Sequence, residues 1–110
     1  MIVRFSDVSE FIEELRENRK DNSVYGGIIR VTRKFDTWPD IPTIYNIYVV
    51  ATYKMDDVIV RLNVYCGDTF NEEHTKKADQ EGEKIIAKLK KASADLGLSY
   101  RAGMYQLTDK

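Results

Sequence analysis

The chain has 110 residues, of which 43% are hydrophobic and 32% are charged, and its formal net charge is -1 at pH 7. This length suits one domain with one hydrophobic core, so we expect a single domain over residues 1–110. The near-zero charge excludes bulk attraction to nucleic acid or to an anionic membrane, and such binding would need a local patch. No apolar run approaches about 18 residues, so we expect no membrane association.

Cys66 is the single cysteine of the chain, which excludes an intramolecular disulfide. A chain with so little cysteine fits a reducing compartment. The first ten residues, MIVRFSDVSE, include no apolar stretch of the length that a signal peptide needs. We therefore expect a cytoplasmic protein.

An apolar stripe near the N-terminus predicts a first helix over residues 7–20. Its members recur at spacings of three and four, as one face of a helix requires; they are Val8, Phe11, Ile12 and Leu15. Ser6 or Asp7 is expected to cap this helix, and Asp7 with Glu10 has the spacing of a capping box.

Three runs of alternating side chains follow, and they predict strands at residues 24–35, 43–55 and 58–66. In the third run the alternate side chains up to Cys66 are apolar, which indicates a face turned to the core. The second run is apolar on both sides and therefore predicts the central strand of a sheet. Asp56 and Asp57, between these two runs, predict a tight hairpin turn.

The first of these strands has a phase that can be read from its alternation. Ile29 and Val31 share one side, which we expect to face the core. Arg30, Thr32 and Lys34 share the other side. This reading places two cations of the strand on the surface.

A longer apolar stripe predicts a second helix over residues 71–96, lying on the sheet. The stripe alternates spacings of four and three, through Ala78, Gly82, Ile85, Leu89, Ala92 and Leu96. Gly97 suits the position after the C-cap, where glycine adopts a left-handed conformation. Residues 98–107 are predicted to form the last strand.

These elements predict a two-layer α+β sandwich in the order α-β-β-β-α-β. The first three strands form an antiparallel meander, and the long helix returns the fourth strand parallel to the third. Pairing of the fourth strand with the first gives a mixed four-stranded sheet in the order 3-2-1-4, with both helices on one face. The other face then presents the polar side chains of the strands.

That polar face is the candidate binding surface. It carries cations, amides and tyrosines where a plain surface would mix acids and bases. Tyr and Arg are enriched in protein interfaces, and tyrosines also stack on the bases of nucleic acid. The expected binding residues are Arg30, Lys34, Asn46, Tyr48, Lys54, Arg61, Asn63 and Tyr65, with Arg101 and Tyr105 of the last strand as further candidates.

Residues for catalysis are sparse. Cys66 and His74 are close enough in sequence to meet, but nothing near them indicates an activated thiol, so we expect a buried thiol and an exposed histidine. Asp68, Glu72, Glu73 and His74 form an acidic cluster without the spacing of a zinc or EF-hand site. No glycine-rich run precedes a helix as in a phosphate loop. We therefore expect no enzymatic activity, no metal and no cofactor.

The order of elements looks like the core of restriction-endonuclease-like nucleases. Activity in that family implies an acidic residue on the second strand and an acidic-x-Lys motif on the third. Here the third strand reads DVIVRLNVYC, with neither Glu-x-Lys nor Asp-x-Lys. The resemblance therefore predicts a nuclease-like fold without an evident catalytic motif.

The first five elements are also similar in order to double-stranded-RNA-binding domains. In that family, lysines at the start of the second helix contact phosphates. Lys76 and Lys77 occupy roughly that place. They follow Glu72 and Glu73 at the four-residue spacing of helix ion pairs, which predicts a solvated helix surface.

The function predicted from these observations is a small non-enzymatic protein-interaction module. Its partner is expected to be a second copy or another protein, because scattered aliphatic residues on the polar face are better covered by protein than left in water. Those residues are Ile28, Ile44, Val50 and Ile59. The alternative is a nucleic-acid-binding domain that uses the same face, with Tyr48 and Tyr65 stacking on bases.

Overall fold

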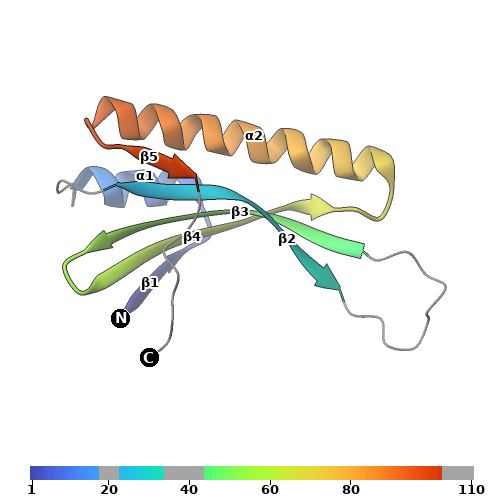
Figure 1. Cartoon of the computed structure of the whole chain (residues 1–110), viewed down its shortest axis with the longest axis horizontal. Helices are drawn as coiled ribbons and strands as arrows, with labels where there is room; N and C mark the ends of the chain where they lie inside the picture. The colour runs from blue at the N-terminus through green and yellow to red at the C-terminus, as the bar shows by residue number, and fades with distance from the viewer. Residues whose placement is uncertain (18–22, 34–43, 103–110) are drawn as a thin grey trace.

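The structure of the protein, a computed structural model, describes residues 1–17, 23–33 and 44–102 (Figure 1). In chain order the elements are β1 (Ile2–Phe5), α1 (Val8–Glu17), β2 (Val24–Arg33), β3 (Ile44–Met55), β4 (Val58–Asp68), α2 (Glu72–Asp95) and β5 (Tyr100–Ala102). The two predicted helices and the four predicted strands are all present, and β1 is an additional strand.

The strands form one mixed sheet in the order β1-β4-β3-β2-β5. The meander of β2, β3 and β4 is antiparallel, and β5 pairs parallel to β2. The predicted α+β fold with a mixed sheet is confirmed. The predicted count of four strands is wrong, because β1 adds a fifth strand parallel to β4. A run of four residues is too short for its alternation to stand out in a sequence.

The ends of the helices follow their local sequence signals. Asp7 caps α1, since its Oδ1 accepts a 2.8 Å hydrogen bond from the Ser9 N–H. Asn71 caps α2 in the same way and accepts a 2.8 Å bond from the His74 N–H. Gly97 follows the C-cap Leu96 with a φ of 71°, a conformation that costs glycine little.

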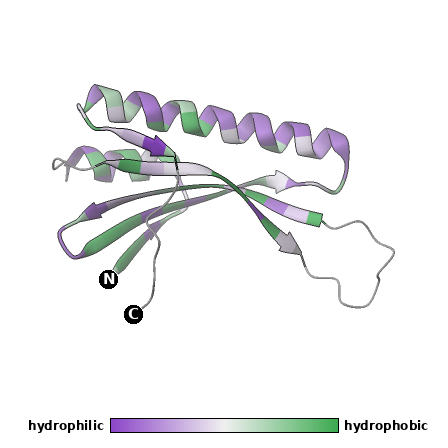
Figure 2. Ribbon diagram, in the orientation of Figure 1, coloured by the Kyte–Doolittle hydropathy of each residue, from purple (hydrophilic) through white to green (hydrophobic). Residues whose placement is uncertain are grey.

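Both helices pack on the same face of the sheet, and the core lies between the two layers (Figure 1). Figure 2 shows α2 as largely hydrophilic with hydrophobic positions at intervals, and those positions form its buried side. Burial of each large aliphatic side chain contributes about 1.5–3 kcal/mol. The core cluster consists of Phe11, Leu15, Val24, Val49, Ala51, Tyr53, Val60, Leu62, Ile85, Ile86 and Leu89.

β3 is the central strand, as predicted, and it is buried on both sides. Val49 belongs to the core beneath the helices, and Val50 and Thr52 on the opposite side are also fully buried. Tyr53, on the core side, is so deeply placed that burial raises the pKa of its phenol. The central part of β3 is therefore buried on both sides, unlike a strand at the surface.

Gly26 lies on β2, where the neighbouring strand β5 runs beside it. A Cβ at Gly26 would lie 2.6 Å from the phenol oxygen of Tyr100 and 3.2 Å from the backbone oxygen of Val50. The first distance is well below van der Waals contact, so the absence of a side chain is what lets the Tyr100 ring lie across β2. Gly27 differs, because a Cβ there would meet nothing within 4 Å. The two adjacent glycines thus serve different purposes.

We expect Gly26→Ala to lower the free energy of unfolding by about 1–3 kcal/mol, because the added methyl group overpacks the contact with Tyr100. Urea unfolding of the dilute protein measures this change. Gly27→Ala is the matched control, and its effect should stay within about 1 kcal/mol.

Tyr100→Phe removes the oxygen that the new methyl group would meet. In that background the cost of Gly26→Ala should become smaller, as a double-mutant cycle would show. An equal cost in both backgrounds would mean that the Tyr100 oxygen is not the reason for glycine at position 26.

Candidate functional site

The sheet has one face that neither helix covers, called here the helix-free face, and the phase of β2 decides which side chains lie on it. Arg30 lies on the helix side, since its Nη2 is 3.7 Å from Oδ2 of Asp79 in α2. Ile28 lies on that side too, because a Cβ at Gly82 of α2 would be 3.0 Å from Ile28 Cδ1. The prediction that Arg30 and Thr32 face away from the helices is therefore wrong.

The reason for this difference is that β2 has apolar side chains in both phases. In one phase Ile28 would face the core, and in the other phase Ile29 and Val31 would face it. A change of phase by one residue turns every side chain of a strand to the opposite face. The ladder to β3 decides between them, because it pairs Ile28 with the core residue Val49 and so leaves Ile29 on the helix-free face.

The helix-free face is basic, aromatic and aliphatic in character. Among the described strand residues that the pairing register places on it, the acidic one is Asp68, opposite Asn46 at the end of β4. This is a departure from an ordinary wet sheet surface, where both signs of charge alternate. Its described members are Ile2, Arg4, Tyr25, Gly27, Ile29, Val31, Ile44, Asn46, Tyr48, Val50, Thr52, Lys54, Ile59, Arg61, Asn63, Tyr65, Asp68 and Arg101.

One row of this face crosses all five strands and is called here the basic row. Strand pairing aligns its five residues in the order Arg101, Tyr25, Thr52, Arg61 and Arg4. Within residues 1–17, 23–33 and 44–102, none of the three arginines forms a salt bridge. The basic row therefore concentrates positive charge that no described acidic side chain neutralises by a salt bridge.

A second row, called here the apolar row, consists of Ile29, Tyr48 and Tyr65. The rings of Tyr48 and Tyr65 meet edge to face, with centroids 5.5 Å apart. Tyr65 is 53% exposed, and Val31, two residues beyond Ile29 on β2, is 45% exposed. Large apolar side chains thus reach solvent at this end of the face.

Most of the predicted binding residues do share one face. The structure places on the helix-free face Asn46, Tyr48, Lys54, Arg61, Asn63 and Tyr65. Arg30 is on the other face, and Lys34 lies outside the described residues. Their role in binding stays a prediction.

Among the residues of the face that were not found from the sequence are Arg4, Ile29 and Val31. Arg4 was missed because its strand is too short to predict. Ile29 and Val31 were assigned to the core because aliphatic side chains in alternation usually indicate a buried side. No local signal distinguishes their phase from that of Ile28.

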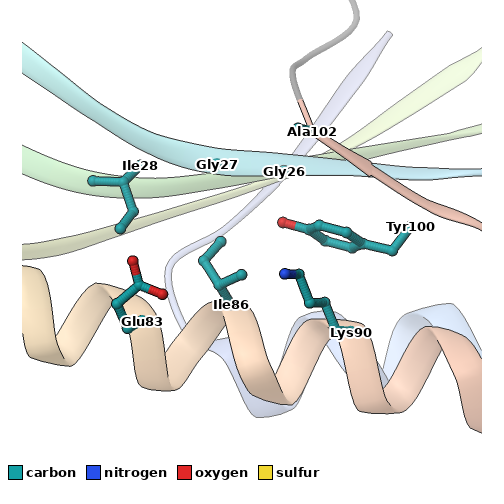
Figure 3. A pocket seen from close by; sticks show the side chains of 8 residues that line it. All are labelled: Gly26, Gly27, Ile28, Glu83, Ile86, Lys90, Tyr100 and Ala102. Atoms are coloured by element: carbon teal, nitrogen blue, oxygen red, sulfur yellow. The ribbon is translucent and has the colours of Figure 1, made fainter.

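A hollow of about 250 Å³ lies on the helix side, between α2 and the strands β2 and β5 (Figure 3). Glu83 and Lys90 project from α2 toward the sheet on either side of Ile86, and Tyr100 lies above Lys90. The Lys90 Nζ is 5.8 Å from the centroid of the Tyr100 ring, a cation–π contact. Burial raises the pKa of the Tyr100 phenol, so the ring stays neutral. These contacts hold β5 against α2, which gives the hollow a structural role.

Cys66 and His74 line a second hollow, of about 200 Å³, together with Asp68. His74 Nδ1 lies 3.6 Å from Asp68 Oδ1. The Cys66 Sγ donates instead to the carbonyl oxygen of Val64, at 3.6 Å. Burial raises the pKa of the Cys66 thiol, which favours the protonated form and disfavours the nucleophilic thiolate.

The structure also bears on the ion pair expected on α2, on metal ligands and on membrane-spanning helices. Lys77 Nζ lies 3.9 Å from Glu73 Oε1, which confirms the predicted helix ion pair. In the described part of the chain, no three His, Cys, Asp or Glu side chains gather as metal ligands would. No described helix has the length and apolar character that crossing a bilayer requires.

Family models, curated proteins and solved structures were each compared with this chain, and none of them matches it. The helix-free face, with its basic row and its apolar row, is the candidate functional site of this protein.

We expect Cys66 to react with iodoacetamide more slowly in the folded chain than in the urea-unfolded chain at pH 8, because less of it is thiolate. The folded chain binds the thiol proton more tightly than the unfolded chain does, so the proton contributes to the free energy of unfolding at neutral pH. That contribution is lost as pH rises through the raised pKa. Mass spectrometry measures the alkylation, with Cys66→Ser as the blank. Faster reaction of the folded chain would instead indicate an activated thiol.

Proposed function

We propose that this protein is a small non-enzymatic interaction module whose apolar row binds the apolar row of a second copy. The observation that supports this most is the exposure of Tyr65 and Val31, at 53% and 45%, on a face that no helix covers. Exposed apolar side chains that lie together mark surfaces that another protein covers. Tyrosine suits such a surface, because it offers a large contact area at a small cost in side-chain entropy.

The residues of β2 favour a second copy as the occupant. Gly27 and Val31 lie on the helix-free face, two residues to either side of Ile29. The space above Gly27 is open, since a Cβ there would meet nothing within 4 Å. A two-fold axis along the apolar row would place Val31 of each copy over Gly27 of the other. Val31 of each copy then fills the open space above Gly27 of the other, so the same contact occurs twice, as a symmetric interface requires.

The same axis keeps the positive charges of the two copies apart. Arg61 and Tyr65 are four residues apart on β4, which is about 13 Å at about 3.3 Å per residue. Rotation about the apolar row therefore separates the two basic rows by about 26 Å along the strands, beyond the Debye length of about 8 Å. An axis along the strands would instead lay the basic row of one copy over that of the other, and an axis along β4 would place Arg61 against Arg61.

Contacts between the aromatic rings would supply the specific part of the affinity. Tyr48 and Tyr65 already pair within one copy, and each ring pair contributes about 0.5–1.5 kcal/mol beyond its buried area. The exposed apolar residues are few compared with an interface of about 800 Å² per partner. We therefore propose a reversible dimer rather than an obligate one.

The dimer is expected to respond to an exchange of side chains between positions 27 and 31. Gly27→Val fills the open position and Val31→Gly removes the projecting side chain, so each alone should weaken dimerisation by about tenfold or more. The double variant restores the contact with the two positions exchanged, and it should recover much of the affinity. Sedimentation equilibrium at increasing protein concentration measures all four chains.

Ala87→Val, on the exposed side of α2, is the control for adding a similar apolar group elsewhere, and it should leave the dimer unchanged. Urea unfolding of the dilute variants separates loss of dimer from loss of fold. A wild-type chain that stays monomeric at high micromolar concentration would reject the proposal, as would a double variant no better than the singles.

A further inference from the structure

We infer that Arg4, Arg61 and Asn63 form a binding site for a phosphate group. These side chains line a cavity of about 210 Å³ on the helix-free face. That volume is about seven times the share of one water molecule in the liquid, about 30 Å³. Arg4 and Asn63 are exposed and Arg61 is half-buried, so the cavity is open to a ligand from solvent.

The two guanidinium groups belong to neighbouring strands. Arg4 of β1 is paired in register with Arg61 of β4, so both side chains project from the same face at adjacent positions. Like charges placed opposite each other on a sheet destabilise it. The described ion pairs of the protein involve other cations, and none joins Arg4 or Arg61. A binding role explains a charge arrangement that does nothing for the fold.

The donors of this cavity suit an anion with several oxygens. Arg61 Nε is buried and has no hydrogen-bond acceptor among the described residues, whereas buried donors nearly always have one. Each guanidinium presents a planar fork of donors that binds phosphate or carboxylate in a bidentate way. Two forks and the Asn63 amide together match the three or four oxygens of phosphate better than the two of a carboxylate.

The phosphate site and the proposed dimer contact depend on different side chains of one face. Arg61 is about 13 Å along β4 from Tyr65, at about 3.3 Å per residue. Asn63 is nearer the dimer contact, because Val50 connects it with Gly27 in one row. The arginine variants therefore test phosphate binding, and the exchange of positions 27 and 31 tests the dimer.

The test uses the full chain at low salt with two probes, inorganic phosphate and an octamer of thymidylate, each titrated by calorimetry. Arg4→Gln and Arg61→Gln should each weaken binding by about tenfold or more, because each removes a charged hydrogen-bond donor. Asn63→Ala should weaken it less. Lys88→Gln, on the exposed side of α2, is the matched control, since it removes one positive charge away from the helix-free face.

The two probes distinguish the source of the phosphate. Binding of both, or of inorganic phosphate alone, with the same dependence on Arg4 and Arg61, supports a small phosphate ligand. Binding of the octamer alone, with a salt dependence that Arg4→Gln and Arg61→Gln reduce, supports the backbone of a single-stranded nucleic acid.

Three results would overturn the site. They are no binding of either probe at low salt, an equal loss in Lys88→Gln, and competition by acetate as strong as that by phosphate. Urea unfolding of each variant checks the fold, and Asn63→Ala, at an exposed position, remains informative if an arginine variant is unstable.

Discussion

The antiparallel pairing of β2 with β3 places every side chain of β2 relative to the helices, and the two faces of the sheet depend on it. With Ile28 opposite Val49, the even-numbered side chains of β2 enter the layer beneath α2. Arg30 then reaches Asp79, and Gly26 leaves the space that Tyr100 occupies. The other set, with Ile29 and Val31, is left on the helix-free face. One choice of phase thus decides both the packing of α2 and the character of the binding surface.

The helix-free face brings together residues that are far apart in the chain. Its basic row begins with Arg4 of β1 and ends with Arg101 of β5, at opposite edges of the sheet. The apolar row lies two rows away, so the exposed Tyr65 lies apart from the arginines of the basic row. The two rows therefore offer different binding chemistry on one face. Apolar contact with a copy would use one end, and an anion would use the other.

Much of the fold follows from short-range patterns in the sequence. The caps Asp7 and Asn71, the turn at Asp56 and the glycine after α2 are set by local backbone chemistry. The two helices follow from apolar stripes, and the core side of β4 follows from strict alternation. β1 escaped prediction, because four residues form a strand only when β4 offers them a partner. Of the candidate site, Tyr65 and Arg61 were predictable because β4 has one apolar side that is unambiguous.

The sequence by itself determined the order of the elements from α1 to β5, the central position of β3 and the presence of tyrosines and cations on one side of β3 and β4. Local propensity and alternation are enough for these, since each depends on residues close together in the chain. Only the tertiary structure decided the phase of β2 and the pairing of Arg4 with Arg61. A strand that is apolar in both phases has no preferred side until another element buries one of them. Here α2 buries Ile28, and that contact between residues more than fifty positions apart decides which side chains of β2 remain on the surface.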